Sequence, residues 1–68
     1  MKNNIKKLRA QHHMTQDQLA ELLAVSRQTI ISLEKEKYNP SIILAFKLAS
    51  VFNCQIEDIF IYEEENNE

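Results

Sequence analysis

The chain has 68 residues, 44% of them hydrophobic, which is enough for one small domain with a marginal core. Its single cysteine excludes an internal disulfide, and no Cys/His cluster suggests zinc, so the composition predicts a protein of the reducing cytosol. The absence of glycine excludes the glycine-rich loops with which many nucleotide-binding enzymes bind phosphate.

The net charge of −2 combines a basic body with an acidic tail. Residues 63–68 hold four of the ten acidic side chains, so residues 1–62 carry eight basic and six acidic side chains, a net charge of +2. We therefore expect a folded domain over residues 1–62 and a disordered acidic tail over residues 63–68. The N-terminal sequence has no apolar signal core, and the longest apolar run, residues 42–46, is far shorter than the roughly 20 residues that span a bilayer.

Residues 3–12 are predicted to form a first helix, because Ile5 and Leu8 lie one turn apart among polar neighbours. His12 and His13 follow at its C-terminal end, where basic side chains suit the helix dipole. Adjacent side chains on a helix diverge by about 100°, so this pair is poorly placed to bind a metal ion.

Thr15 is predicted to open a second helix, because its hydroxyl can accept from free backbone amides and Gln18 completes a capping box. The apolar face of this helix is expected to contain Leu19, Ala20, Leu22 and Leu23. A tight turn at Ala24-Val25 follows, and Ser26 is the next N-cap residue. The pattern therefore predicts two short helices separated by a tight turn.

The third helix, from about Arg27 to Lys35, has an unusual outer side. Ile30 and Leu33 are expected to point inward. Four side chains remain outside: Arg27, Gln28, Ile31 and Ser32. Arg and Gln can form paired hydrogen bonds with guanine and adenine, and an aliphatic side chain can touch a thymine methyl group. The residues alone leave two readings open, a DNA-reading helix and an ordinary solvated helix surface.

A fourth helix is expected over about Ile42 to Asn53, after Pro40 and with Ser41 as its N-cap. One apolar face would contain Ile42, Ala45, Leu48, Ala49 and Phe52. Ile43 and Phe46 fall on another side. Either the helix is buried on two sides within the monomer, or these two residues belong to an interface.

A short helical turn over residues 56–59 and a strand-like segment over residues 59–62 complete the domain. A lone strand needs a partner, which either residues 1–3 or the same strand of a second subunit could supply. Cys54 is expected to be a small core residue, with redox sensing as the alternative.

The segment over residues 15–41, TQDQLAELLAVSRQTIISLEKEKYNPS, resembles the helix-turn-helix of the phage repressor and Cro-like family of bacterial transcriptional regulators. The resemblance extends from about Ile5 to Phe60 and includes TQ-x-x-LA, VSRQTI, LEK and a final EDIF. It is greatest to small stand-alone repressors such as the cytolysin repressor. It implies an all-α, lambda-repressor-like domain of five helices with a short two-stranded antiparallel sheet near the termini, which binds DNA as a homodimer and needs no cofactor.

The resemblance also implies roles for individual residues. It assigns base reading to Arg27, Gln28 and Ser32, and contact with either the DNA backbone or a base to Thr29. We interpret Ile31, where many members carry a polar residue, as a thymine contact. It assigns phosphate contacts to Gln16, Lys35, Lys37, Tyr38 and Asn39. It implies an ion pair between Arg9 and Glu34. We further predict a dimer interface that includes Phe60, Ile61 and Tyr62.

The turn departs from the family pattern, because Ala24 stands where members usually have glycine. A positive φ would cost alanine roughly 1 kcal/mol, so a slightly different turn is expected.

These features predict a cytoplasmic, sequence-specific regulator that binds a palindromic operator as a homodimer, occludes polymerase and so represses transcription. The alternative is an antitoxin that binds a toxin protein and represses its own operon, although a toxin-binding extension is missing unless residues 60–68 serve. An enzyme is not expected, because Cys54 and the histidines are far apart in the sequence and have no oxyanion or metal motif beside them.

Overall fold

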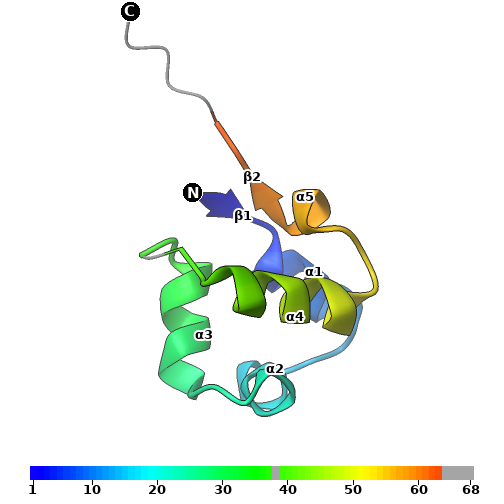
Figure 1. Ribbon diagram of the computed structural model, residues 1–68. Coiled ribbons are helices and arrows are strands. Elements are labelled where there is room, and N and C mark those ends of the chain that lie inside the picture. Colours follow the sequence, from blue (N-terminus) through cyan, green and yellow to red (C-terminus); the bar gives the residue numbers. More distant parts are fainter. Residues whose placement is uncertain (38, 64–68) are drawn as a thin grey trace, which may run out of the picture.

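Five helices and two short strands occupy the part of the chain that the computed structural model describes, residues 1–37 and 39–63 (Figure 1). In chain order the elements are β1 (Lys2–Asn3), α1 (Ile5–Gln11), α2 (Gln16–Leu23), α3 (Arg27–Glu34), α4 (Ile42–Phe52), α5 (Ile56–Ile59) and β2 (Phe60–Ile61). This confirms the expected class of five helices with a short antiparallel sheet. Most of the expected acidic tail, residues 64–68, lies outside the described residues.

The two strands bring the beginning and end of the domain together. They pair antiparallel, with Lys2 opposite Ile61 and Asn3 opposite Phe60. The N-terminal residues of the same chain therefore supply the partner that the second strand needs. The first helix begins at Ile5, later than expected, because Asn3 belongs to this sheet.

The three predicted N-caps are confirmed. In each, a side-chain oxygen accepts a hydrogen bond from the backbone amide three residues further on: Thr15 from Gln18 at 3.0 Å, Ser26 from Thr29 at 3.1 Å, and Ser41 from Leu44 at 3.1 Å. The Gln18 side chain accepts in return from the Thr15 amide at 2.8 Å, which completes the capping box. Each cap typically contributes about 1 kcal/mol, and together they fix where α2, α3 and α4 begin.

The first four helices end in a shared motif that usually requires glycine. Each is followed by a left-handed residue, with φ between 54° and 61°: His13, Ala24, Glu36 and Asn53. After α2, for example, the amides of Ala24 and Val25 donate to the carbonyls of Glu21 and Ala20 at 3.1 and 3.0 Å, the two bonds of a Schellman motif. Ala24 thus adopts the conformation of the glycine it replaces, so the expectation of a different turn is wrong.

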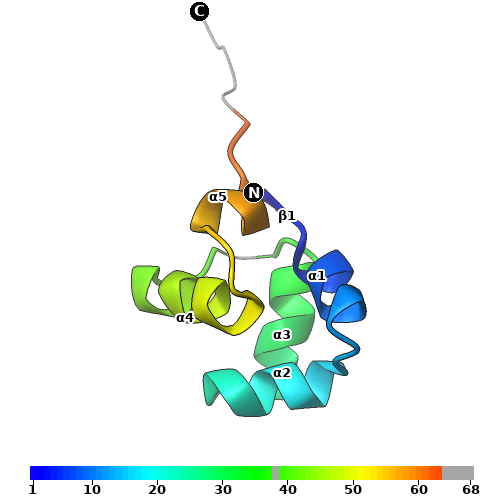
Figure 2. The same ribbon diagram turned by 90° about the vertical axis from the view of Figure 1, so that its right-hand side faces the viewer.

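The core lies between the helices, and seven side chains in it are at most 1% exposed: Ile5, Leu19, Leu23, Ile30, Leu33, Leu48 and Ile59. Figure 2 shows α4 and α1 on opposite sides of α3, with α2 across their lower ends. Each such aliphatic side chain contributes about 1.5–3 kcal/mol by leaving water. Cys54 packs against this core at intermediate exposure, as expected. Burial, with a smaller contribution from Asp58, raises the pKa of its thiol and disfavours the reactive thiolate.

Two residues predicted to face inward are exposed, Leu22 by 59% and Ile42 by 71%. Successive residues on a helix are rotated by about 100°. The buried side of α4 is centred near Leu44 and Leu48, and Ile42 falls beyond its edge. The buried side of α2 contains Leu19, Ala20 and Leu23, and Leu22 lies one step outside it. In both cases the spacing of apolar residues correctly predicted a helix, but the buried side of that helix is rotated from the side that we predicted.

Candidate nucleic-acid interface

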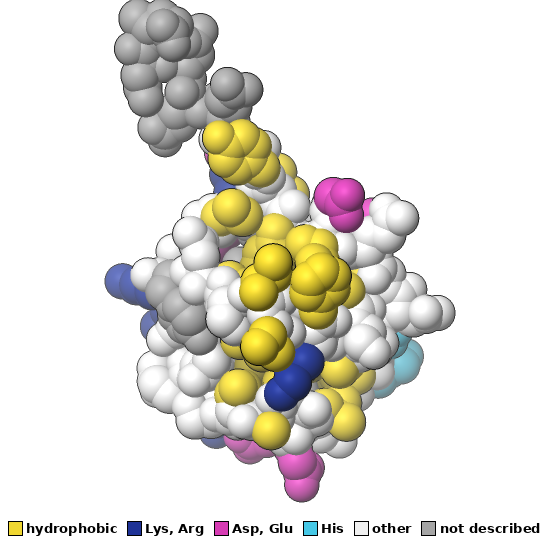
Figure 3. Space-filling view, in the orientation of Figure 1, with side chains coloured by type: hydrophobic (Ala, Val, Ile, Leu, Met, Phe, Trp, Pro, Cys, Tyr) yellow, Lys and Arg dark blue, Asp and Glu magenta, His cyan; other side chains and the backbone are white. Residues whose placement is uncertain are grey.

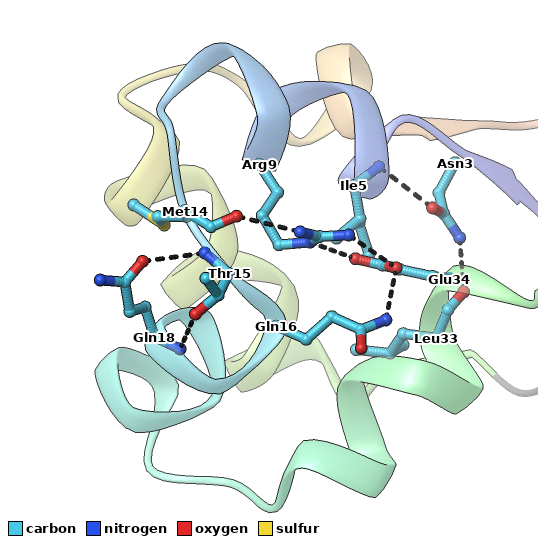
Figure 4. A network of polar contacts seen from close by, with 9 residues as sticks. All are labelled: Asn3, Ile5, Arg9, Met14, Thr15, Gln16, Gln18, Leu33 and Glu34. Carbon is cyan, nitrogen blue, oxygen red and sulfur yellow. Dashed lines mark hydrogen bonds and ion pairs between the residues drawn. The ribbon is translucent and has the colours of Figure 1, made fainter.

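A largely buried polar cluster supports α3 from the inner side (Figure 4). The Nε and Nη2 atoms of Arg9 donate to the two carboxylate oxygens of Glu34 at 2.7 and 3.3 Å. Nη1 of Arg9 donates to the backbone carbonyl of Met14 at 2.9 Å. The Arg9 and Glu34 side chains are only 15% and 7% exposed. The ion pair implied by the family resemblance is therefore present, and it fixes the end of α3 against α1 and the chain that leads into α2.

Gln16 joins the same cluster at the first residue of α2. Its side-chain nitrogen donates to Oε1 of Glu34 at 3.0 Å. An amide nitrogen has two hydrogens, so one remains for another acceptor. The phosphate contact of Gln16 therefore stays a prediction. The second hydrogen of the side-chain nitrogen could make it while the first stays bonded to Glu34.

Asn3 adds a second link that the sequence did not reveal. Its side-chain nitrogen donates to the Leu33 carbonyl at 2.8 Å, and its side-chain oxygen accepts from the Ile5 amide at 3.1 Å. The first bond joins residues 30 positions apart, so no local pattern marks it. Through Asn3, β1 holds the last turn of α3 at the same end as the Arg9–Glu34 pair.

The outer face of α3 contains four of the predicted base-reading residues, Arg27, Gln28, Ile31 and Ser32. Arg27 and Gln28 are exposed, and Ile31 and Ser32 are half-buried. These positions follow one another around the side of the helix that is opposite the buried Ile30 and Leu33. One helix side thus brings together a guanidinium, an amide, an aliphatic group and a hydroxyl.

Thr29 and Arg27 each contact a neighbour within the chain. The Thr29 hydroxyl lies 3.0 Å from the Ser26 hydroxyl, so the N-cap of α3 occupies part of its hydrogen-bonding capacity. Nε of Arg27 lies 3.7 Å from Oδ1 of Asp17 on α2, and both side chains are more than 60% exposed. The sequence did not reveal this contact. An exposed pair of this kind is weak and leaves Arg27 free to rearrange.

Basic side chains follow directly after α3. Lys35, Lys37 and Asn39 are exposed. The left-handed Glu36 turns the chain here, and the Lys37 amide donates to the Ser32 carbonyl at 3.0 Å. The two lysines therefore lie directly after the end of α3. Tyr38, the remaining predicted phosphate contact in this loop, lies outside the described residues.

The three residues predicted at the dimer interface differ in how far their side chains are exposed to solvent. Phe60 is half-buried against the core, whereas Ile61 is 40% and Tyr62 75% exposed. Lys2 beside them pairs with Glu63, with Nζ 3.0 Å from Oε2, and this contact raises the pKa of Lys2. Their place in an interface stays a prediction.

The described residues contain no group of three or more His, Cys, Asp or Glu side chains that could hold a metal ion. His12 instead lies against Phe52, with ring centroids 5.3 Å apart. Over the same described ranges, the helices are all too short to cross a membrane.

Comparisons with known proteins point to one kind of protein. The helix-turn-helix family model matches residues 5–59. The chain is 60% identical over 65 residues to an uncharacterized HTH-type transcriptional regulator of Methanocaldococcus jannaschii, covering 96% of this chain and 98% of that protein. It is 46% identical over 66 residues to the uncharacterized HTH-type transcriptional regulator YgzD of Bacillus subtilis, covering 97% and 100%.

A solved structure agrees with these relatives. A transcriptional regulator from Listeria innocua superposes with a TM-score of 0.78 at 25% identity, covering 100% of this chain and 68% of that one. The relatives come from archaea as well as from a bacterium, so the likeness does not by itself assign this chain to the bacteria.

Proposed function

Because the chain belongs to the helix-turn-helix family of transcriptional regulators, we propose that it represses transcription by binding a palindromic operator as a homodimer. The family consists of DNA-binding regulators and not of enzymes.

The outer face of α3 is the observation that carries the proposal. Arg27 and Gln28 can each make two hydrogen bonds to a base edge in the major groove, guanine for Arg and adenine for Gln. Ile31 can contact a thymine methyl group, and Ser32 can bond to several bases. The Arg9–Glu34 pair supports this recognition because it fixes the angle of α3 without using any group of the outer face.

Phosphate contacts would supply most of the affinity. Lys35 and Lys37 lie at the end of α3, where they can neutralise backbone phosphates and release condensed counterions. Such contacts orient the protein but carry no sequence information. Glu63, the first residue of the acidic segment, contacts Lys2 on the sheet rather than α3.

Two-fold symmetry follows from the size of the site. One short helix reads only a few base pairs, whereas a dimer places two such helices about 34 Å apart on successive turns of one DNA face. A symmetric dimer selects a symmetric site, and a bound dimer over a promoter blocks polymerase.

An antitoxin role is the second candidate. The observation that favours it is an exposed apolar surface on α4, where Ile42, Ile43 and Phe46 are 60% to 71% exposed and a protein partner could bind. A toxin-like protein encoded beside this gene, with nanomolar affinity for the chain, would support this role.

Selection of bound sites from a random duplex library tests the proposal. We expect enrichment of an inverted repeat with half-site centres about 10 base pairs apart. Weak binding without sequence preference at every salt concentration would contradict it. Enrichment of a single asymmetric half-site would contradict the homodimer alone.

A further inference from the structure

Three large apolar side chains form a continuous exposed stripe on α4. Ile42, Ile43 and Phe46 are 71%, 67% and 60% exposed, and Phe46 lies three and four residues after the two isoleucines. We call these three residues the α4 patch. Hydrophobic side chains gather over α4 in Figure 3 and continue towards β2. Of the two alternatives left open by the sequence, their exposure rules out the one in which α4 is buried on two sides within the monomer.

DNA reading does not explain the α4 patch. The outer face of α3 points away from the core because Ile30 and Leu33 point into it. Figure 2 shows α4 and α1 on opposite sides of α3, and Figure 3 shows that hydrophobic side chains gather over α4 on the face towards the viewer. The patch therefore lies on a flank of the molecule, beside the outer face of α3. The major groove presents polar base edges with only scattered thymine methyl groups, and phosphates are charged, so neither matches a continuous stripe of isoleucine and phenylalanine.

The two borders of the α4 patch carry opposite charges. Lys47 lines a shallow recess with Ile43, and Glu57 lines another, of about 280 Å³, with Phe46. The second recess has a largely apolar floor that includes Ile56. A surface with an apolar centre, a base on one border and an acid on the other is complementary to itself after a two-fold rotation.

We propose that the α4 patch is the centre of the homodimer interface, where it packs against the α4 patch of a second copy, with Lys47 of each copy facing Glu57 of the other. The proposal rests on the proposed function, because reading a palindrome requires a two-fold axis. An axis parallel to the direction of the outer face of α3 keeps both reading helices on one side of the dimer. Dimerisation through a flank therefore lets both α3 helices face the same DNA. Dimerisation through a surface opposite α3 would instead put the two α3 helices on opposite sides of the dimer.

The usual size and composition of a dimer interface agree with an interface centred on the α4 patch. A specific interface usually buries about 800 Å² per partner, with an apolar centre and a polar rim. Three large side chains form such a centre but not the whole interface. The rim must include Lys47 and Glu57, and it extends towards β2, where Ile61 and Tyr62 are exposed. The interface predicted from the sequence then becomes the margin of a larger surface.

Removal of the Phe46 ring tests the centre of the interface. Phe46→Ser should weaken the dimer roughly 30-fold or more in analytical ultracentrifugation, since the change occurs twice per dimer and each truncated anchor costs over about 1 kcal/mol. Phe46 is 60% exposed, so the thermal unfolding of the monomer should change little. Leu22→Ser is the matched control, because Leu22 is 59% exposed on α2 and lines a different recess. A dimer that survives Phe46→Ser, or is weakened equally by Leu22→Ser, would overturn the proposal.

Charge exchange tests the register of the two copies. Lys47→Glu or Glu57→Lys alone should weaken the dimer, because each places like charges opposite one another twice. The double variant should recover most of the loss. Additive losses in the double variant would show that these residues do not face each other.

Failure of this proposal can be distinguished from failure of the proposed function. If the chain is not an operator-binding dimer, the wild-type protein will select no inverted repeat. If only the α4 assignment is wrong, the wild-type protein will select an inverted repeat, and Phe46→Ser will do so with unchanged affinity. If the patch binds a toxin instead, the wild-type protein will be monomeric in ultracentrifugation and Phe46→Ser will abolish the toxin complex.

Discussion

The inner and outer sides of α3 differ in how far the chain itself satisfies their polar groups. On the inner side, Glu34 accepts from Arg9 and Gln16, and Asn3 bonds the last turn of the helix. On the outer face, Arg27 makes one long contact with an exposed carboxylate. The inner side therefore fixes where the helix lies, and the outer face keeps hydrogen-bonding groups available for a ligand. A reading helix needs both, since a loosely held helix cannot align several side chains with base edges at once.

The largest expected effect is the loss of stability when the ion pair on the inner side of α3 is broken. Glu34→Ala leaves the Arg9 guanidinium largely buried without its partner, and this should lower the free energy of unfolding by about 3 kcal/mol in urea denaturation. The double variant Arg9→Met/Glu34→Leu should be far less destabilised, because no unpaired charge remains. Equal destabilisation of the single and double variants would mean that the pair acts through packing rather than charge.

A smaller effect is expected on the outer face, and on binding rather than stability. Arg27→Ala should cost roughly 1–3 kcal/mol of specific binding and relax the preference at one base pair per half-site. Unfolding should be unchanged, because Arg27 is exposed. Fluorescence anisotropy with the selected operator and with random duplex measures both quantities. The same loss on every sequence would remove the base-reading role of Arg27.

Lys37 should behave differently from Arg27 although both are exposed. Lys37→Ala should weaken binding to operator and random DNA alike, and should reduce the slope of log affinity against log salt by about 1 per contact. A salt series with both duplexes provides the measurement. A loss confined to the operator would show that Lys37 contacts a base.

The smallest expected effect concerns the turn that leads into α3. Ala24→Gly should raise the free energy of unfolding by up to about 1 kcal/mol, because glycine adopts a positive φ without steric cost. Ala10→Gly, within the regular helix α1, should lower it by a similar amount. Thermal unfolding of both variants and of the wild-type protein measures these two opposite changes in stability. Destabilisation by Ala24→Gly would indicate that the alanine methyl group makes packing contacts that outweigh its backbone strain.

The sequence predicted the beginnings of helices better than their ends. Ser26 and Ser41 cap through their own side chains, so the signal and the structure lie within three residues of each other. The ends carry no such signal, because His13, Ala24 and Glu36 occupy left-handed positions that glycine normally marks. The backbone hydrogen bonds of the Schellman motif close these ends, and they need no particular side chain that would mark them in the sequence.

The candidate site shows the same limit. The composition of the outer face of α3 was visible from helical spacing, because its members are close in sequence. The Arg9–Glu34 pair, 25 residues apart, came only from the family resemblance, and the Asn3 bond to Leu33 was missed altogether. The exposure of Ile42 was also missed, since the spacing of apolar residues on α4 allows two inner faces and only the neighbouring helices select one.

The most direct test of the account repeats the site selection with Arg27→Ala beside the wild-type protein. If the outer face of α3 reads the operator, both proteins will enrich the same inverted repeat, and the variant will lose its preference at one symmetric pair of positions. An unchanged motif in the variant would contradict the account, because the residue best placed to read a base would then contribute nothing to sequence recognition.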